Sequence, residues 1–160
     1  MVFCYYQCMK RKSIDEVMPD GQIRVKVMCL FVRDGKVLAA KGKDESASKD
    51  YYRVIGGTLD FGEIAEQGIR REIREELDSE IENLEFLKIV ESIFIHEKRK
   101  GHQITFLYRG ELSNESIYNK DVVVLNEKDY DAQAEWVECA KILDGTVILY
   151  PEFDYEYLLK

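Results

Sequence analysis

Three glutamates stand close together in the run RREIREE: Glu72, Glu75 and Glu76. On a helix these positions share one arc of the surface, where like charges destabilise the helix. Hard divalent cations such as Mg²⁺ prefer carboxylate oxygens, together with water and phosphate oxygens. A cation bound there would relieve the repulsion and polarise a phosphoryl oxygen. The spacing therefore indicates metal-assisted phosphate chemistry, although RREIREE by itself also suits a solvated helix face.

A helix over residues 63–77 must position these carboxylates. Its apolar residues recur every fourth position and form one stripe, at Ala65, Ile69, Ile73 and Leu77. The three glutamates fall beside this stripe, so we expect them at the edge of the buried surface. Gly62 is the predicted cap of the helix start.

A pair of glycines precedes the helix. The run YYRVI (51–55) predicts a strand that ends in Gly56 and Gly57. Glycines there tolerate positive φ and let a ligand approach the backbone. The carbonyl group of Gly57 is therefore a further candidate ligand for a cation bound to the helix.

The spacing of the whole stretch resembles the Nudix box. Gly57 is followed after five residues by Glu63, and after seven more by Arg71, Glu72, an apolar residue, any residue and the pair Glu75 and Glu76. Two positions depart from the family pattern. Asp78 stands where a closing glycine is expected, and Ser79 where an apolar residue is expected. These departures affect the expected helix end and leave the charged positions intact.

The resemblance covers residues 22–158 and implies an α/β fold, the Nudix-type α/β/α sandwich with a mixed central sheet. It implies hydrolysis, dependent on Mg²⁺ or Mn²⁺, of a diphosphate linked to another moiety. The metal ligands would be Gly57, Glu72, Glu75 and Glu76, and Glu72 is our choice as base for the attacking water. Arg71 and Glu63 would form a pair that orients the cluster.

The resemblance also implies a further carboxylate from the loop before Trp136. Glu127, Asp129 and Asp131 are the candidates, and each also suits a solvated acidic loop. Arg53 and Tyr52 precede the glycines and could bind the phosphates and the base of a substrate. The alternatives for these two are a solvent-facing cation and a core aromatic residue.

The substrate class stays open between a nucleotide sugar, an ADP-ribose-like compound and a nucleoside triphosphate. The region VESIFIHEK lacks the proline or tyrosine that two Nudix subfamilies carry after the box. A catalytically weak nucleotide-binding or regulatory module is the alternative function. Because no glutamate of RExxEE is missing, the sequence favours an enzyme.

The bulk properties favour one domain that acts on a small molecule. The 160 residues carry a net charge of −8, which argues against extended electrostatic binding of nucleic acid. No apolar run is long enough to predict a membrane span, and four scattered cysteines suit a reducing, cytoplasmic setting. We expect an N-terminal extension over 1–21 and the hydrolase domain over 22–160. The expected partner is a small nucleotide diphosphate, and a homodimer is an open alternative.

The remaining elements are predicted to be mostly strands. Asp34 and Gly35 join two β-rich runs within 22–38 as a hairpin, and a polar surface loop follows over 41–50. Further strands are predicted at 86–95 and 102–112. A strand leading into a short helix is predicted over 134–143, and a terminal helix over 151–160, with Pro151 in its first turn.

Overall fold

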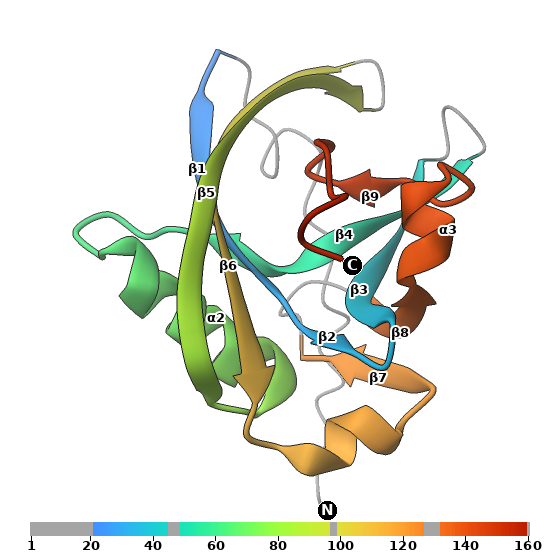
Figure 1. Ribbon diagram of the computed structural model, residues 1–160. Helices are drawn as coiled ribbons and strands as arrows, with labels where there is room; N and C mark the ends of the chain where they lie inside the picture. Colours follow the sequence, from blue (N-terminus) through green and yellow to red (C-terminus); the bar gives the residue numbers. More distant parts are fainter. Residues whose placement is uncertain (1–20, 45–48, 97–98, 127–131, 160) are drawn as a thin grey trace, which may run out of the picture.

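The computed structural model describes residues 21–44, 49–96, 99–126 and 132–159 (Figure 1). In this part of the chain the strands are β1 (Ile23–Leu30), β2 (Val32–Arg33), β3 (Lys36–Asp44), β4 (Lys49–Thr58), β5 (Ile81–His96), β6 (Arg99–Leu112), β7 (Val122–Leu125), β8 (Ala132–Glu138) and β9 (Leu149–Tyr150). The helices are α2 (Ala65–Leu77), the 3-10 helix η1 (Glu115–Asn119) and α3 (Cys139–Leu143).

The strands form one mixed sheet in the order β5-β6-β1-β4-β3-β8-β7. β2 pairs with β3 and β9 with β4 outside this path. The pairs β1–β6 and β4–β9 are parallel, whereas the other pairs are antiparallel. This arrangement confirms the mixed sheet that was predicted.

Each face of the sheet carries its own hydrophobic core. Side chains alternate along β4, so Ile55 packs with Ile69 and Ile73 of α2, whereas Val54 packs on the opposite face with Ile142 of α3. Figure 1 shows α2 and α3 on opposite sides of the strands. The α/β/α layering is therefore confirmed, and it places the acidic helix against one face of β4.

The first hairpin forms at the predicted turn. Asp34 and Gly35 have φ of 51° and 71°, the left-handed conformation that a tight hairpin turn needs. The surface loop predicted over 41–50 is too long, because β3 extends to Asp44 and β4 begins at Lys49. Backbone pairing between these two strands holds the polar residues in the sheet, a cross-strand effect that the local sequence does not reveal.

The predicted C-terminal helix is wrong. Residues 151–159 form turns without a helix, and the hydroxyl group of Tyr155 donates to the carbonyl of Pro151 at 2.9 Å. Tyr155, Leu158 and Leu159 are buried in the core on the α3 face. Burial of these side chains outweighs the helical preference of the segment.

The start predicted for the acidic helix is two residues early. α2 begins at Ala65, and its N-cap is Ile64, whose side chain makes no capping bond. Gly62 has φ of 85°, which an N-cap residue does not adopt. The carboxylate of Glu63 instead accepts from the backbone N–H of Asp60 at 3.3 Å and is held by Arg71. The segment before α2 is thus a turn organised by the site.

The end of α2 accommodates both departures from the Nudix pattern. Asp78 has φ and ψ of 49°, the left-handed conformation usual for a closing glycine. Ser79 is buried, and its hydroxyl donates to the carbonyl of Glu80 at 3.0 Å and accepts from the N–H of Asn114 at 3.1 Å. Ser79 therefore replaces an apolar residue without leaving a buried polar group unsatisfied.

We expect Asp78→Gly to raise the free energy of unfolding by up to about 1 kcal/mol, because glycine adopts the left-handed conformation without steric cost. The bonds of Asp78 are made by its backbone, with its N–H donating to Arg74 at 3.1 Å and its carbonyl accepting from Asn114 at 3.5 Å. Both bonds survive the change. Urea unfolding measures the effect, and a loss of stability, or a loss of activity beyond a few-fold, would contradict this account of the cap.

The N-terminal extension predicted over 1–21 lies outside the described residues except for Gly21. Within the described ranges, no helix combines the length and the apolar character that crossing a membrane requires.

Candidate active site

Arg71, in the middle of α2, is the centre of a network of carboxylates. Its Nε and Nη2 atoms each donate to one oxygen of Glu63, both at 3.0 Å. Its Nη1 atom donates to Oε1 of Glu72 at 2.8 Å and lies 3.6 Å from Oε2 of Glu75. One guanidinium group thus contacts all three of these glutamates through its planar set of donors.

The same arginine ties the helix to the segment after β4. Its Nη2 atom donates to the backbone carbonyl of Thr58 at 3.0 Å and lies 3.6 Å from the carboxylate of Asp60. Glu63 belongs to this segment, and its carboxylate also accepts from Nη2 of Arg71. The network therefore fixes the position of α2 relative to the glycine end of β4.

The charges of Arg71 and Glu63 stabilise each other. The hydrogen bonds that Arg71 donates hold the pKa of the Glu63 carboxyl below its usual range. The bonds to Glu63, and after them those to Glu72, raise the pKa of the Arg71 guanidinium. Both groups are therefore ionised at neutral pH.

Glu72 lies directly against Gly57. A Cβ atom at position 57 would overlap the carboxyl group of Glu72, so a residue larger than glycine cannot occupy this position without displacing it. The Glu72 side chain is only 13% exposed. Burial raises the pKa of the Glu72 carboxyl, and the bond from Arg71 and the charge of Lys26 oppose this shift.

The other two helix glutamates flank Glu72 with different exposure. The side chain of Glu75 is 39% exposed, whereas Glu76 is 4% exposed as a residue. The three glutamates thus lie at the edge of the buried surface, as predicted. Glu76 is the most buried of them.

The donor set suits a hard divalent cation, which binds carboxylate and carbonyl oxygens. Arg71 uses Oε1 of Glu72, which leaves Oε2 beside Gly57 for another partner. Among the described residues, no three His, Cys, Asp or Glu side chains already converge at metal-binding distances. Glu72 and Glu75 are instead drawn toward Arg71, so the side chains of the cluster must rotate to surround a cation.

The structure does not bring Tyr52 to this cluster. Tyr52 alternates to the opposite face of β4, and its hydroxyl donates to Glu135 at 3.0 Å. Arg53 shares the face of Gly57, four residues away, or about 13 Å along an extended strand. Burial, and after it the charge of Arg53, lowers the pKa of the Arg24 guanidinium. Glu127, Asp129 and Asp131 lie outside the described residues.

Sequence reasoning missed three polar residues of the network: Lys26, Thr58 and Asp60. The Nζ atom of Lys26 donates to Oγ1 of Thr58 at 2.8 Å across the β1–β4 pair. Asp60 and Thr58 precede Glu63 within the Nudix box, so their nearness to the site could have been read from the spacing. Lys26 depends on strand register, which the sequence did not reveal.

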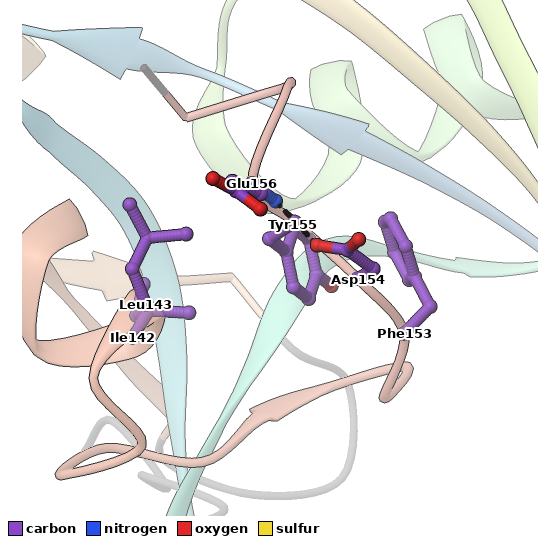
Figure 2. A pocket seen from close by; sticks show the side chains of 6 residues that line it. All are labelled: Ile142, Leu143, Phe153, Asp154, Tyr155 and Glu156. Atoms are coloured by element: carbon purple, nitrogen blue, oxygen red, sulfur yellow. Dashed lines mark hydrogen bonds between the residues drawn. The ribbon is translucent and has the colours of Figure 1, made fainter.

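A hollow of about 480 Å³ lies elsewhere, between α3 and the C-terminal segment (Figure 2). Its lining is Ile142, Leu143, Phe153, Asp154, Tyr155 and Glu156. Several of these residues belong to the core on the α3 face, opposite α2. Two of these six residues carry carboxylates and none carries a positive charge, so this lining does not suit a phosphate group.

Comparison with known proteins supports the fold. The family model described as NUDIX domain matches residues 22–156. A MutT NUDIX hydrolase from Burkholderia pseudomallei has a similar structure, with a TM-score of 0.57 and 24% sequence identity, over 86% of this chain and 95% of that one. A MutT protein from Bacillus halodurans gives a TM-score of 0.55 at 17% identity, over 80% and 75% of the two chains. An ADP compounds hydrolase gives a TM-score of 0.52 at 16% sequence identity, over 77% of this chain and 61% of that one.

Proposed function

The chain belongs to the Nudix family, and from this membership we propose that it cleaves the diphosphate bond of a nucleoside diphosphate linked to another moiety, with Mg²⁺ or Mn²⁺. It is a Nudix hydrolase of the pyrophosphatase type. The candidate substrates are a nucleotide sugar, an ADP-ribose-like compound and a nucleoside triphosphate. The hydrolase domain spans residues 22–160 in this proposal.

The observation that carries the proposal is the contact of Glu72 with Gly57 beneath the Arg71 network. Structural ion pairs on a helix surface do not require a glycine on the facing strand. Here the backbone of β4 approaches the carboxylate so closely that a Cβ atom at position 57 would displace it. This close approach suits a site where a backbone carbonyl and carboxylates bind the same cation.

Each residue of the cluster has a proposed role. Glu72, Glu75, Glu76 and the carbonyl of Gly57 would hold the cation, and Glu72 would also serve as the base that accepts a proton from the attacking water. When bound, the cation would screen the phosphate charge and polarise the phosphoryl oxygen.

Two supporting groups complete the site. Arg71 and Glu63 touch no reacting atom in this proposal and orient the ligands. Arg53 is the proposed contact for the substrate phosphates. Tyr52 is the proposed contact for the base, although its side chain faces away from the cluster. One of Glu127, Asp129 and Asp131 would add a carboxylate from the loop before β8.

A substrate screen tests the function. Nucleotide sugars, ADP-ribose-like compounds and nucleoside triphosphates are incubated with the protein and Mg²⁺ or Mn²⁺. Released phosphate is measured after coupling to a phosphatase for the first two classes, and to an inorganic pyrophosphatase for the triphosphates, which a phosphatase would attack directly. Turnover of one class above the others names the substrate. An absence of turnover with every class and both metals would favour the weak binding module instead.

Metal binding gives a separate test. We expect Mg²⁺ or Mn²⁺ to raise the melting temperature, because a ligand that binds only the folded state stabilises it. The double variant Glu72→Gln with Glu76→Gln should lose this response, whereas Glu66→Gln, with its exposed carboxylate paired to Arg70, should keep it. Identical melting curves of the parent protein in EDTA and in excess Mg²⁺ would refute the proposed ligands.

The proposed setting of the protein follows from its charge and its substrate. We place it in the cytoplasm, where nucleotide diphosphates are available, and propose no nucleic acid or membrane as partner. The net charge of −8 supports the exclusion of nucleic acid as a partner. A homodimer stays an open alternative in this proposal.

A further inference from the structure

Lys26 of β1 carries its ammonium group beside the glycine end of β4. Its Nζ atom donates to Oγ1 of Thr58 at 2.8 Å, and Thr58 directly follows Gly57 as the last residue of β4. Strand register pairs Lys26 with Thr58 and Val27 with Gly57. Because paired strands lie about 4.8 Å apart and rise about 3.3 Å per residue, the Cα atoms of Lys26 and Gly57 are roughly 6 Å apart. The ammonium group therefore extends from a position close to the backbone that Glu72 contacts.

Thr58 connects Lys26 with the catalytic network. Its side chain accepts from Lys26, whereas its backbone carbonyl accepts from Nη2 of Arg71 at 3.0 Å. One residue earlier, the backbone of Gly57 lies against the carboxyl group of Glu72. Groups of opposite charge thus flank the end of β4, the ammonium group at Thr58 and the carboxyl group at Gly57.

The ammonium group and the glutamates belong to opposite faces of the sheet. Side chains alternate along β1, so Lys26 shares the face of Met28, which packs in the core on the α3 face. Val27 lies on the other face, in the core formed with α2. A substrate that lies across the end of β4 is therefore within reach of the helix glutamates from one face and of Lys26 from the other.

The local charge favours an anion at this position. Arg24 lies two residues earlier on the same face of β1, and both Arg24 and Lys26 are partly buried. Burial raises the pKa of the Glu72 carboxyl, and the charge of Lys26, after that of Arg71, opposes this shift. Two cationic side chains on one face of a strand create a positive local potential in a chain whose net charge is −8.

A buried hydroxyl group lies on the other side of Lys26. Register pairs Lys26 with Thr105 of β6. Thr105 is completely buried, and its Oγ1 atom has no hydrogen-bond partner within the described ranges. Most buried hydroxyl groups are hydrogen-bonded, so an unpartnered one indicates a position that is not optimised for packing alone. Lys26 thus stands between two threonines on a face that otherwise holds an apolar core.

We propose that Lys26 is a substrate-binding residue whose ammonium group donates to a phosphate oxygen of the substrate, on the face of the β4 end opposite the helix glutamates. This inference rests on the proposed cleavage of a diphosphate. An ammonium group has three donors, so it can bond the Thr58 hydroxyl and a phosphate oxygen at the same time. Thr58 is a positioning residue, because it directs the ammonium group and touches no reacting atom.

Calorimetric titration of the full chain with methylenediphosphonate in Mg²⁺ tests the contact, because this diphosphate analogue cannot be hydrolysed. Lys26→Met keeps most of the aliphatic stem, removes the charge and should raise Kd at least about tenfold. Lys26→Arg should restore Kd to within a few-fold of the parent value, since a guanidinium group also binds phosphate. Thr58→Val should raise Kd by a smaller factor. Lys36→Met, at an exposed lysine of the β2–β3 hairpin, is the matched control and should bind like the parent.

Two further measurements separate binding from a structural role. Mg²⁺ should still raise the melting temperature of Lys26→Met, because loss of a nearby positive charge does not oppose cation binding. KM for the substrate found by the screen should rise by about the same factor as Kd, whereas a lysine that only positions Glu72 would change kcat and leave both constants unaltered. Far-UV circular dichroism checks that each variant is folded.

The possible failures are distinguishable. If the parent turns over a substrate but Lys26→Met matches Lys36→Met in Kd and KM, the role of Lys26 is refuted and the hydrolase function stands. The same holds if Lys26→Arg is as weak as Lys26→Met, or if the Mg²⁺ response disappears with the charge of Lys26. A parent protein that turns over no substrate and does not bind the analogue refutes the proposed function, and the role of Lys26 with it.

Discussion

Glu72→Gln and Glu76→Gln should each lower kcat by about 10²-fold or more, the loss expected when acid–base or metal function is removed. Glutamine keeps the volume and polarity of the side chain and removes its charge. Both positions are largely buried, with Glu72 13% exposed and Glu76 4% exposed, so their charges are less screened by solvent than those of surface glutamates. The measurement is kcat on the substrate found by the screen, at saturating Mg²⁺.

The double variant should lose less activity than the product of the two single losses, because residues that act on one reaction centre are not additive. Glu66→Gln is the matched control on the same helix. Its carboxylate is exposed and pairs with Arg70 at 3.1 Å, an interaction of small energetic value. If Glu72→Gln and Glu76→Gln behave like Glu66→Gln while substrate is turned over, α2 is a solvated helix face and the chemistry occurs elsewhere.

The parts of the fold that local patterns specify were predictable from sequence. The four-residue apolar repeat of α2 and the Asp34-Gly35 turn each depend on neighbouring residues, and both appear as predicted. The terminal helix failed because Tyr155, Leu158 and Leu159 are held by burial against distant strands. Local propensity cannot report packing against residues far away in the chain.

The candidate site likewise contains some residues that the local sequence predicts and others that depend on distant strands. The spacing of the Nudix box placed Gly57, Glu63, Arg71 and Glu72 in one motif, and the structure brings these four into contact. Lys26 joins them only through the register of β1 on β4, which no short motif records. Tyr52 was a candidate both for substrate binding and for the core, and strand alternation turns its side chain to the other face, toward Glu135.

Arg71→Gln should lower kcat by about 10²-fold, the cost of a small displacement of catalytic groups. The substitution removes the bidentate pair with Glu63 and the bond to Glu72, so α2 is no longer tied to the segment after β4. Arg71→Lys should restore little of the activity, because an ammonium group cannot donate to Glu63 and Glu72 with the same planar geometry. The measurement is kcat at saturating Mg²⁺.

Arg74→Gln is the matched control, since this residue lies on the same helix and bonds Glu80 at 2.6 Å with half of its side chain exposed. Its activity should stay close to that of the parent protein, because exposed pairs contribute little. Removing the Arg71 charge beside Glu72 also favours cation binding electrostatically. The Mg²⁺ concentration for half-maximal activity should therefore not rise in Arg71→Gln, and the loss should appear in kcat. A variant whose activity returns fully at high Mg²⁺ would mean that Arg71 serves metal affinity, whereas equal effects of Arg71→Gln and Arg74→Gln would remove Arg71 from the site.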